Sequence, residues 1–149
     1  MELTKPYAGW SNLTVGKFTI HVSYLTDILE DFVEVFENFI KNDCNYYQKT
    51  PAVIRLDAEE YGDLLLIINN WETILVTDDD SRNVYFEYLS VNESMLSFAK
   101  CFLNDIYDWV YHFEIWAEDM ETEEDYKKKH QEYKEKLTDI VEELEKHIK

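Results

Sequence analysis

The sequence predicts an α+β fold in which an antiparallel sheet of about five strands carries its helices on one face. Three features of the hydrophobic pattern lead to this prediction. Apolar and polar residues alternate with a period of two near the N-terminus, and the period becomes helical at residue 26. Short apolar segments follow, and helical spacing returns from residue 92 towards the C-terminus. The expected order of elements is β-α-β-β-β-β-α-α.

The first predicted strand spans residues 17–24, where apolar and polar side chains alternate. Phe18, Ile20, Val22 and Tyr24 fall on one face of an extended chain, and Lys17, Thr19, His21 and Ser23 fall on the other. This pattern is typical of a strand with one side in solvent, and it makes His21 an ordinary surface histidine. Gly16 is expected to form a turn before the strand, and residues 13–15 are a candidate for a short preceding strand.

A helix is predicted from residue 26 to residue 41, because apolar residues recur there at helical spacing. They are Ile28, Leu29, Phe32, Val33, Phe36, Phe39 and Ile40. The opposite side is acidic and consists of Asp27, Glu30, Asp31, Glu34 and Glu37. Thr26 or Asp27 is expected to cap the helix, with Glu30 completing a capping box. Lys41 lies at the C-terminal end, where the helix dipole favours a cation.

Four further strands are predicted at residues 53–57, 63–68, 71–77 and 84–90. Asn69 and Asn70 lie between two of these segments and favour a two-residue hairpin, because asparagine tolerates positive φ. Residues 64–68 are continuously apolar, which indicates a central strand that is covered on both faces.

Two helices are predicted after the strands. The first runs from residue 92 to about residue 117 and carries an apolar stripe: Met95, Phe98, Ala99, Phe102, Ile106, Trp109, Val110, Phe113 and Trp116. The second follows an acidic break at residues 118–125 and repeats with steps of four and three: Tyr126, His130, Tyr133, Leu137, Ile140, Leu144 and His147. Residues 1–120 are therefore expected to form an acidic α+β domain. Residues 121–149 form a C-terminal helix that packs on this domain or on a partner, including a second copy.

The charge of the chain is concentrated in its first 120 residues. That segment holds seven basic residues against 22 acidic ones, a balance of −15 out of a formal net charge of −18. Such a field repels nucleic acid and anionic membranes, so direct binding to either is not expected. It attracts a cation or a basic protein surface.

Composition places the chain among folded, cytoplasmic proteins. It contains 4 Trp, 11 Tyr and 8 Phe, whereas disordered acidic chains are poor in aromatic residues. No apolar run approaches the roughly 18–20 residues of a membrane-spanning helix, and residues 1–6 lead into no signal core. Cys44 and Cys101 belong to no paired motif, as expected for reduced cytosolic thiols.

No recognised reaction centre or cofactor site is found in the sequence. The three glycines, Gly9, Gly16 and Gly62, form no phosphate-binding loop, and neither cysteine nor any serine lies in a nucleophile motif. The chain is therefore expected not to be an enzyme and to bind no cofactor.

A metal site is not expected either. Asp78, Asp79 and Asp80 begin a calcium-like pattern, but its sixth position is Asn83 and its twelfth is Leu89. Asp108 and His112 lie four residues apart on one helix. They lack a third ligand of known position, and an ion pair explains their spacing as well.

Two acidic surfaces are candidates for binding a partner. Successive turns of an antiparallel meander alternate between the ends of the sheet, so the turns after residues 57 and 78 should lie together. They carry Asp57, Glu59, Glu60, Tyr61, Asp63, Asp78, Asp79 and Asp80, which are the first candidates for partner binding. The alternative surface is the acidic side of the first helix, with Asp27, Glu30, Asp31, Glu34 and Glu37.

In size, acidity, cysteine usage and α+β layout the chain resembles the bacterial immunity proteins, which neutralise toxins, many of them nucleases. The resemblance implies an acidic inhibitor that masks a basic enzyme or toxin surface. Two alternatives stay open. The chain could imitate nucleic acid and occupy the channel of a DNA-binding enzyme, or it could be a non-catalytic adaptor domain that forms homodimers through its C-terminal helix.

Overall fold

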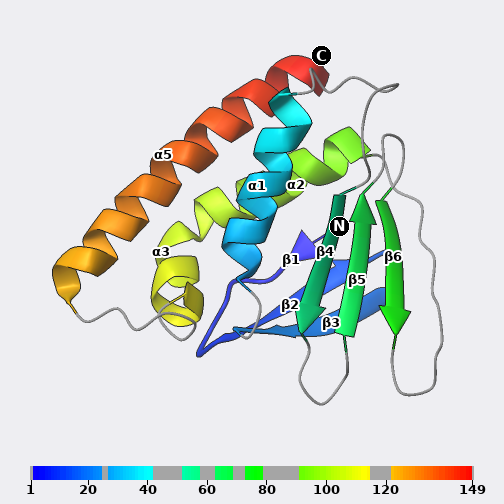
Figure 1. Ribbon diagram of the computed structural model, residues 1–149, viewed down its shortest axis with the longest axis horizontal. Helices are drawn as coiled ribbons and strands as arrows, with labels where there is room; N and C mark the ends of the chain where they lie inside the picture. Colours follow the sequence, from blue (N-terminus) through cyan, green and yellow to red (C-terminus); the bar gives the residue numbers. More distant parts are fainter. Residues whose placement is uncertain are drawn as a thin grey trace.

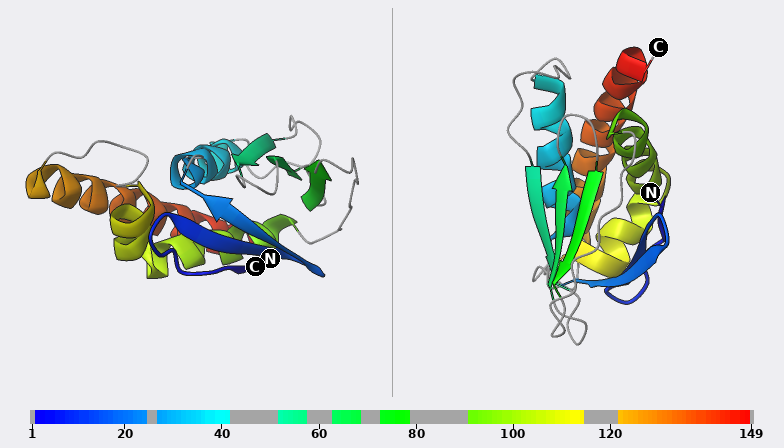
Figure 2. Two further views of the ribbon diagram at one scale, coloured as in Figure 1. Left: turned by 90° about the horizontal axis from the view of Figure 1, so that it is seen from below. Right: turned by 90° about the vertical axis from the view of Figure 1, so that its right-hand side faces the viewer.

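The protein belongs to the α+β class. The computed structural model describes residues 2–24, 27–41, 52–57, 63–68, 73–78, 91–114 and 122–148, with the backbone alone for the three strands between residues 52 and 78. The described strands form two three-stranded antiparallel sheets, ordered β1-β2-β3 and β4-β5-β6. Figure 1 shows α1 (Ile28–Lys41), α2 (Val91–Asn104) and α5 (Glu123–Ile148) to one side of β4–β6. Figure 2 shows two layers, α1 with β4–β6 and α2 with β1–β3.

The prediction of one sheet with about five strands is wrong. The first sheet contains β1 (Glu2–Leu3), β2 (Trp10–Val15) and β3 (Phe18–Ser23). The hydrophobic pattern indicated only part of β2 and none of β1, because β1 is two residues long and β2 is half polar. Gly16, at φ 57°, lies in the tight turn that pairs Val15 with Phe18.

The second sheet follows the predicted meander closely. It contains β4 (Ala52–Asp57), β5 (Asp63–Ile68) and β6 (Thr73–Asp78), and the apolar β5 is the central strand. The register pairs Ile68 with Thr73, so four residues separate the paired positions instead of the two that a hairpin at Asn69 and Asn70 would need. The strand predicted at residues 84–90 lies outside the described residues.

Helix α1 (Ile28–Lys41) has one apolar side and one acidic side, as predicted. Ile28, Leu29, Phe32, Val33, Phe36 and Phe39 are buried. Asp27 caps the helix, since its Oδ1 accepts a hydrogen bond from the backbone N–H of Glu30 at 3.0 Å. The Glu30 carboxylate accepts a hydrogen bond from the hydroxyl of Tyr133 on α5 (Glu123–Ile148), and this bond joins the two helices.

The single helix predicted from residue 92 to about residue 117 is wrong, because the chain bends at Asp105. Helix α2 (Val91–Asn104) is followed by α3 (Ile106–Asp108) and by the π-helical turn η2 (Trp109–Glu114). Asp105 adopts φ −108° and ψ 22°, outside helical geometry. Asparagine and aspartate favour such a break because their side chains compete for backbone hydrogen bonds. The wider π-helical turn leaves both Trp109 and Val110 buried.

Aromatic rings hold the helices together. The centroid of the Phe32 ring on α1 lies 4.9 Å from that of Phe98 and 5.5 Å from that of Phe102, both on α2. The Phe102 centroid lies 4.7 Å from that of Trp109 on η2. These rings are almost fully removed from solvent, and each buried aromatic side chain stabilises the fold by roughly 1.5–3 kcal/mol.

Helix α5 (Glu123–Ile148) completes this core. It contacts both α1 and α2, and its buried residues are Tyr133, Leu137, Ile140 and Leu144. Thr122 caps it, because the Thr122 Oγ1 accepts a hydrogen bond from the backbone N–H of Asp125 at 3.1 Å. In the described residues, no helix combines the length and apolarity needed to cross a membrane.

The hydrogen bond between Tyr133 and Glu30 should contribute to the packing of α5 on α1. We expect Tyr133→Phe to lower the free energy of unfolding by about 1–2 kcal/mol, because a hydroxyl bond to a carboxylate is lost while the ring remains. Urea denaturation measures the change. In a Glu30→Gln background the same substitution should cost less, and an equal cost in both backgrounds would show that the two side chains are not coupled.

Candidate functional site

The acidic side of α1 contains a cluster of carboxylates that form no ion pair in the described part of the chain. We define the α1 acidic cluster as Asp27, Glu30, Asp31 and Glu34. Glu30 and Glu34 are exposed, and no member forms an ion pair with a cation in the described part of the chain. Glu37, the fifth residue of the predicted surface, pairs with Lys41 at 3.4 Å. The cluster therefore projects a negative field from the first turns of the helix.

The neighbouring carboxylates affect the pKa of Asp31. Partial burial raises the pKa of Asp31, and the charges of Asp27, Glu34 and Glu30 raise it further. A carboxylate in this position is stabilised by an incoming cation, because the cation offsets the repulsion from its neighbours.

The other end of the acidic side lies along a groove between α1 and α5. The groove has a volume of about 230 Å³ and is lined by Glu37, Ile40, Lys41, Lys136, Asp139, Ile140 and Glu143. Lys136 pairs with Glu132 at 3.1 Å, and the bond to Glu132 raises the lysine pKa, with further increases from Glu30 and Glu37. Lysines thus offset the acids at this end, and Lys136 also interacts with Glu30. Asp27, Asp31 and Glu34 form no ion pair among the described residues.

The first candidate surface is described only in part. In the register of the strands, Asp63 on β5 lies opposite Asp57 on β4 and opposite Asp78 on β6. These three aspartates therefore occupy one row across the end of the β4–β6 sheet, which is the lower end in Figure 1. Neighbouring strands lie about 4.8 Å apart, which brings the three backbone positions within roughly 10 Å. Glu59, Glu60, Tyr61, Asp79 and Asp80 lie outside the described residues.

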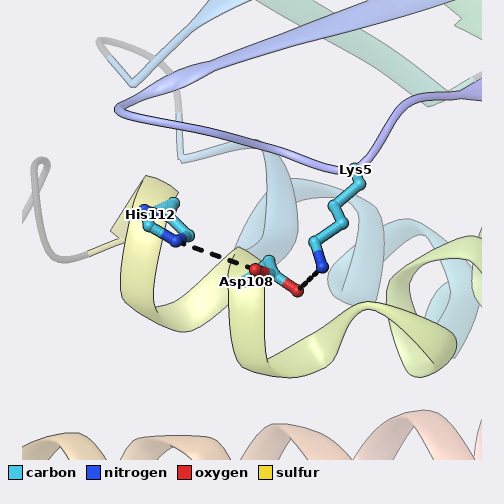
Figure 3. Close-up of polar contacts among 3 residues, drawn as sticks. All are labelled: Lys5, Asp108 and His112. Carbon is cyan, nitrogen blue, oxygen red and sulfur yellow. Dashed lines mark ion pairs between the residues drawn. The ribbon is translucent and has the colours of Figure 1, made fainter.

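Asp108 and His112 belong to an ion-pair cluster with Lys5. Their four-residue spacing also suits metal ligands. The Lys5 Nζ lies 2.8 Å from the Asp108 Oδ2, and the His112 Nε2 lies 3.7 Å from the Asp108 Oδ1 (Figure 3). The hydrogen bond and charge of Asp108 raise the pKa of Lys5. No group of three candidate metal ligands occurs among the described residues.

The turn between β1 and β2 packs onto this cluster. Tyr7 and Trp10 exchange backbone hydrogen bonds of 2.9 and 3.1 Å around Ala8 and Gly9, both at positive φ. The Gly9 N–H donates to the carbonyl of His112 on η2. A Cβ at Gly9 would lie 2.8 Å from the Tyr24 ring, so the close packing requires glycine. The turn thereby holds Tyr7 beside η2.

Exposed tyrosines gather where this turn meets α3 and η2. We define the tyrosine patch as Tyr7, Tyr107 and Tyr111, whose exposed fractions are 74%, 53% and 44%. The Tyr107 and Tyr111 rings stack at 5.6 Å and 17°, and the Tyr7 ring lies 5.1 Å from that of His112. One feature of the sequence is consistent with this surface: Tyr107 and Tyr111 are four residues apart and lie outside the apolar stripe.

Tyr126 of α5 lies beneath the patch. Its ring meets the edges of Tyr107 at 5.9 Å and of Tyr111 at 5.8 Å. Its hydroxyl is enclosed and has no hydrogen-bond partner among the described residues. Burial raises the pKa of Tyr126 to about 12, and nearby Tyr107 adds to the increase.

A comparison of the chain with protein-family models, with curated proteins and with solved structures found no match.

The raised pKa of Asp31 has a measurable consequence. The folded state holds the Asp31 proton more tightly than the unfolded state, so ionised Asp31 destabilises the fold at neutral pH. We expect Asp31→Asn to raise the free energy of unfolding at pH 7, because the substitution removes a carboxylate that is ionised at a cost in the folded state. This advantage over the wild type should shrink as the pH falls through the raised pKa, and urea denaturation across pH measures it. If the stability difference between Asp31→Asn and the wild type were independent of pH, the raised pKa of Asp31 would not be its cause.

The enclosed hydroxyl of Tyr126 predicts a difference at alkaline pH. Above about pH 10 the unfolded chain loses the Tyr126 proton, whereas the folded chain retains it up to its pKa of about 12. The free energy of unfolding should therefore fall with rising pH across this interval, by about 1–2 kcal/mol from this group. Tyr126→Phe should remove that part of the slope without lowering stability at pH 7.

The exposed Tyr111→Phe serves as the matched control for Tyr126→Phe and should leave the alkaline slope nearly unchanged. A loss of more than about 1 kcal/mol at pH 7 in Tyr126→Phe would show that its hydroxyl makes a hydrogen bond.

Proposed function

We propose that this chain is an acidic binding protein that masks a basic surface of an enzyme or toxin, in the manner of the bacterial immunity proteins. The observation that carries the proposal is the α1 acidic cluster, whose four carboxylates have no ion-pair partner in the described part of the chain. A formal net charge of −18 adds a long-range attraction for a basic partner.

The distribution of ion pairs supports this proposal over a general role of the acids in solubility. On α5, lysines pair with glutamates of the same helix, as in Lys127 with Glu123 and Lys136 with Glu132. The α1 acidic cluster lacks such pairing, and Asp31 within it is partly buried. Repulsion among these groups reduces stability, and a bound cationic surface would relieve it.

The row of Asp57, Asp63 and Asp78 supplies a second negative region at one end of the β4–β6 sheet. The proposed binding surface includes this row together with Glu59, Glu60, Tyr61, Asp79 and Asp80. Electrostatic steering by both regions would speed association with a basic partner, towards roughly 10⁸–10⁹ M⁻¹s⁻¹ at low salt.

A nucleic-acid mimic is supported less well. The acids from Asp27 to Glu37 follow one helix, and at about 1.5 Å per residue they cover only about 15 Å. That is the length of roughly four base pairs of duplex. A homodimer through the heptad-spaced side of α5 is also supported less well, because Tyr133, Leu137, Ile140 and Leu144 are buried against the chain's own helices.

The test uses a panel of purified basic toxin nuclease domains, with association measured by stopped-flow fluorescence. For a domain that binds, we expect Asp31→Asn/Glu34→Gln to reduce the association rate about fivefold to tenfold and to weaken its dependence on salt, with little change in dissociation. The matched control is Glu135→Gln/Glu142→Gln, which removes the same charge from exposed positions on α5.

An equal effect of both double variants on the association rate would show that the α1 acidic cluster has no special role in attracting the partner. Binding to no basic domain in the panel would count against the inhibitor proposal. Competition by duplex DNA for a DNA-binding enzyme, with no effect on toxins, would favour the mimic.

A further inference from the structure

The tyrosine patch has the properties of a protein-binding surface, and the acidity of the chain does not account for it. Two of its rings come from the consecutive segments α3 and η2, and the third comes from the β1–β2 turn, about a hundred residues earlier in the chain. Large aromatic side chains are usually buried, and a group of exposed ones on one surface is typical of interfaces. Tyrosine is also among the residues that contribute most to binding energy.

The rings are held in place before any partner arrives. Tyr107 and Tyr111 stack on each other, and both meet the Tyr126 ring edge-on. Tyr7 is fixed through its backbone bonds to Trp10 and by the contact of its ring with His112. Ordered side chains lose little entropy on binding, so a partner would contact a preformed aromatic surface.

A carboxylate lies near the patch, on the far side of His112. The His112 ring lies 5.1 Å from that of Tyr7 and 4.8 Å from that of Tyr111. Its Nε2 lies 3.7 Å from the Asp108 Oδ1.

Asp108 follows Tyr107 in α3, and its side chain is only 14% exposed. One of its oxygens is paired with Lys5, whose side chain is 61% exposed and reaches Asp108 from the segment before the β1–β2 turn (Figure 3). Lys5 is therefore a surface cation that another cation of suitable geometry can replace.

We propose that the tyrosine patch binds an arginine side chain of a basic protein partner, with the guanidinium on the Tyr107 and Tyr111 rings and paired with Asp108 in place of Lys5. Guanidinium stacks on aromatic faces and forms bidentate bonds to carboxylates, which an ammonium group cannot match. The charge of −18 selects a basic partner, and in this respect the inference rests on the proposed function.

The probe is a fluorescein-labelled peptide of four Arg-Gly repeats, titrated into the full chain at about 150 mM salt and followed by anisotropy and backbone amide NMR shifts. We expect the largest shifts around Tyr7, Tyr107 and Tyr111. Tyr107→Ala/Tyr111→Ala should weaken binding about fivefold or more, whereas Tyr107→Phe/Tyr111→Phe should stay within about twofold of the wild type, because the ring face supplies the attraction. The matching Lys-Gly peptide should bind more weakly.

Lys5 gives a readout that a loss of folding cannot imitate. We expect Lys5→Met to bind the arginine peptide more tightly, by about twofold to threefold beyond any effect of charge, because the internal competitor for Asp108 is removed. The matched control is Lys17→Met, which changes the charge equally at the exposed turn between β2 and β3.

Several outcomes would overturn the proposal. Unchanged peptide affinity in Tyr107→Ala/Tyr111→Ala, or equal affinities of Lys5→Met and Lys17→Met, would remove the patch as an arginine site. Self-association of the wild type that the alanine variant abolishes would assign the patch to a second copy instead. Shifts confined to α1 would leave the proposed function standing and overturn only this inference. A peptide that does not bind at all would count against both.

Discussion

The contact of Phe32 with Phe98 and Phe102 is the interaction on which the rest of the structure depends. It joins α1 to α2, and through Trp109 it extends to η2. Helix α5 packs against the same two helices and adds its own buried residues to the cluster. A chain with a net charge of −18 repels itself when it becomes compact, and burial of these aromatic rings is a large favourable term that offsets this repulsion.

This core determines how the acidic residues are arranged. Because α1 turns its phenylalanines inward, its carboxylates must lie on the outer side and at the helix start. Two of them also contribute to the fold: Asp27 caps the helix, and Glu30 bonds to Tyr133 of α5. The same residues thus support local structure and form part of the proposed binding surface. Substitutions that only remove charge must therefore be chosen among the other members, Asp31 and Glu34.

The bend at Asp105 has a comparable effect on the arrangement of the tyrosines in α3 and η2. If α2 continued as a regular helix to residue 117, Tyr107 and Tyr111 would belong to that single helix. The break and the π-helical turn instead leave Trp109 and Val110 buried while Tyr107 and Tyr111 remain exposed and stacked. Departures from regular helix are often found at functional sites, and here the irregular segment contacts the β1–β2 turn through the His112 carbonyl.

The sequence by itself determined the α+β class, the position and two sides of α1 and the order of the β4–β6 meander. It limited the cap of α1 to Thr26 or Asp27, and the structure shows Asp27. These features follow from periodicity and from residues close together in the chain, which short-range sterics and hydrogen bonding govern. It could not determine β1 or the first half of β2, because the stability of these strands comes from pairing with one another and not from apolar content. The bend at Asp105 was missed because the apolar stripe runs through it without interruption.

The candidate sites differ in the same way: the sequence determined one of them, and the tertiary structure decided the other. The acidic side of α1 could be read from spacing, since residues on one helix keep fixed relative positions. The tyrosine patch could not, because it forms only when the turn at Ala8 and Gly9 packs against η2, roughly a hundred residues away along the chain. Which carboxylates stay unpaired, and which tyrosines stay exposed, depends on long-range packing, and only the tertiary structure decided that.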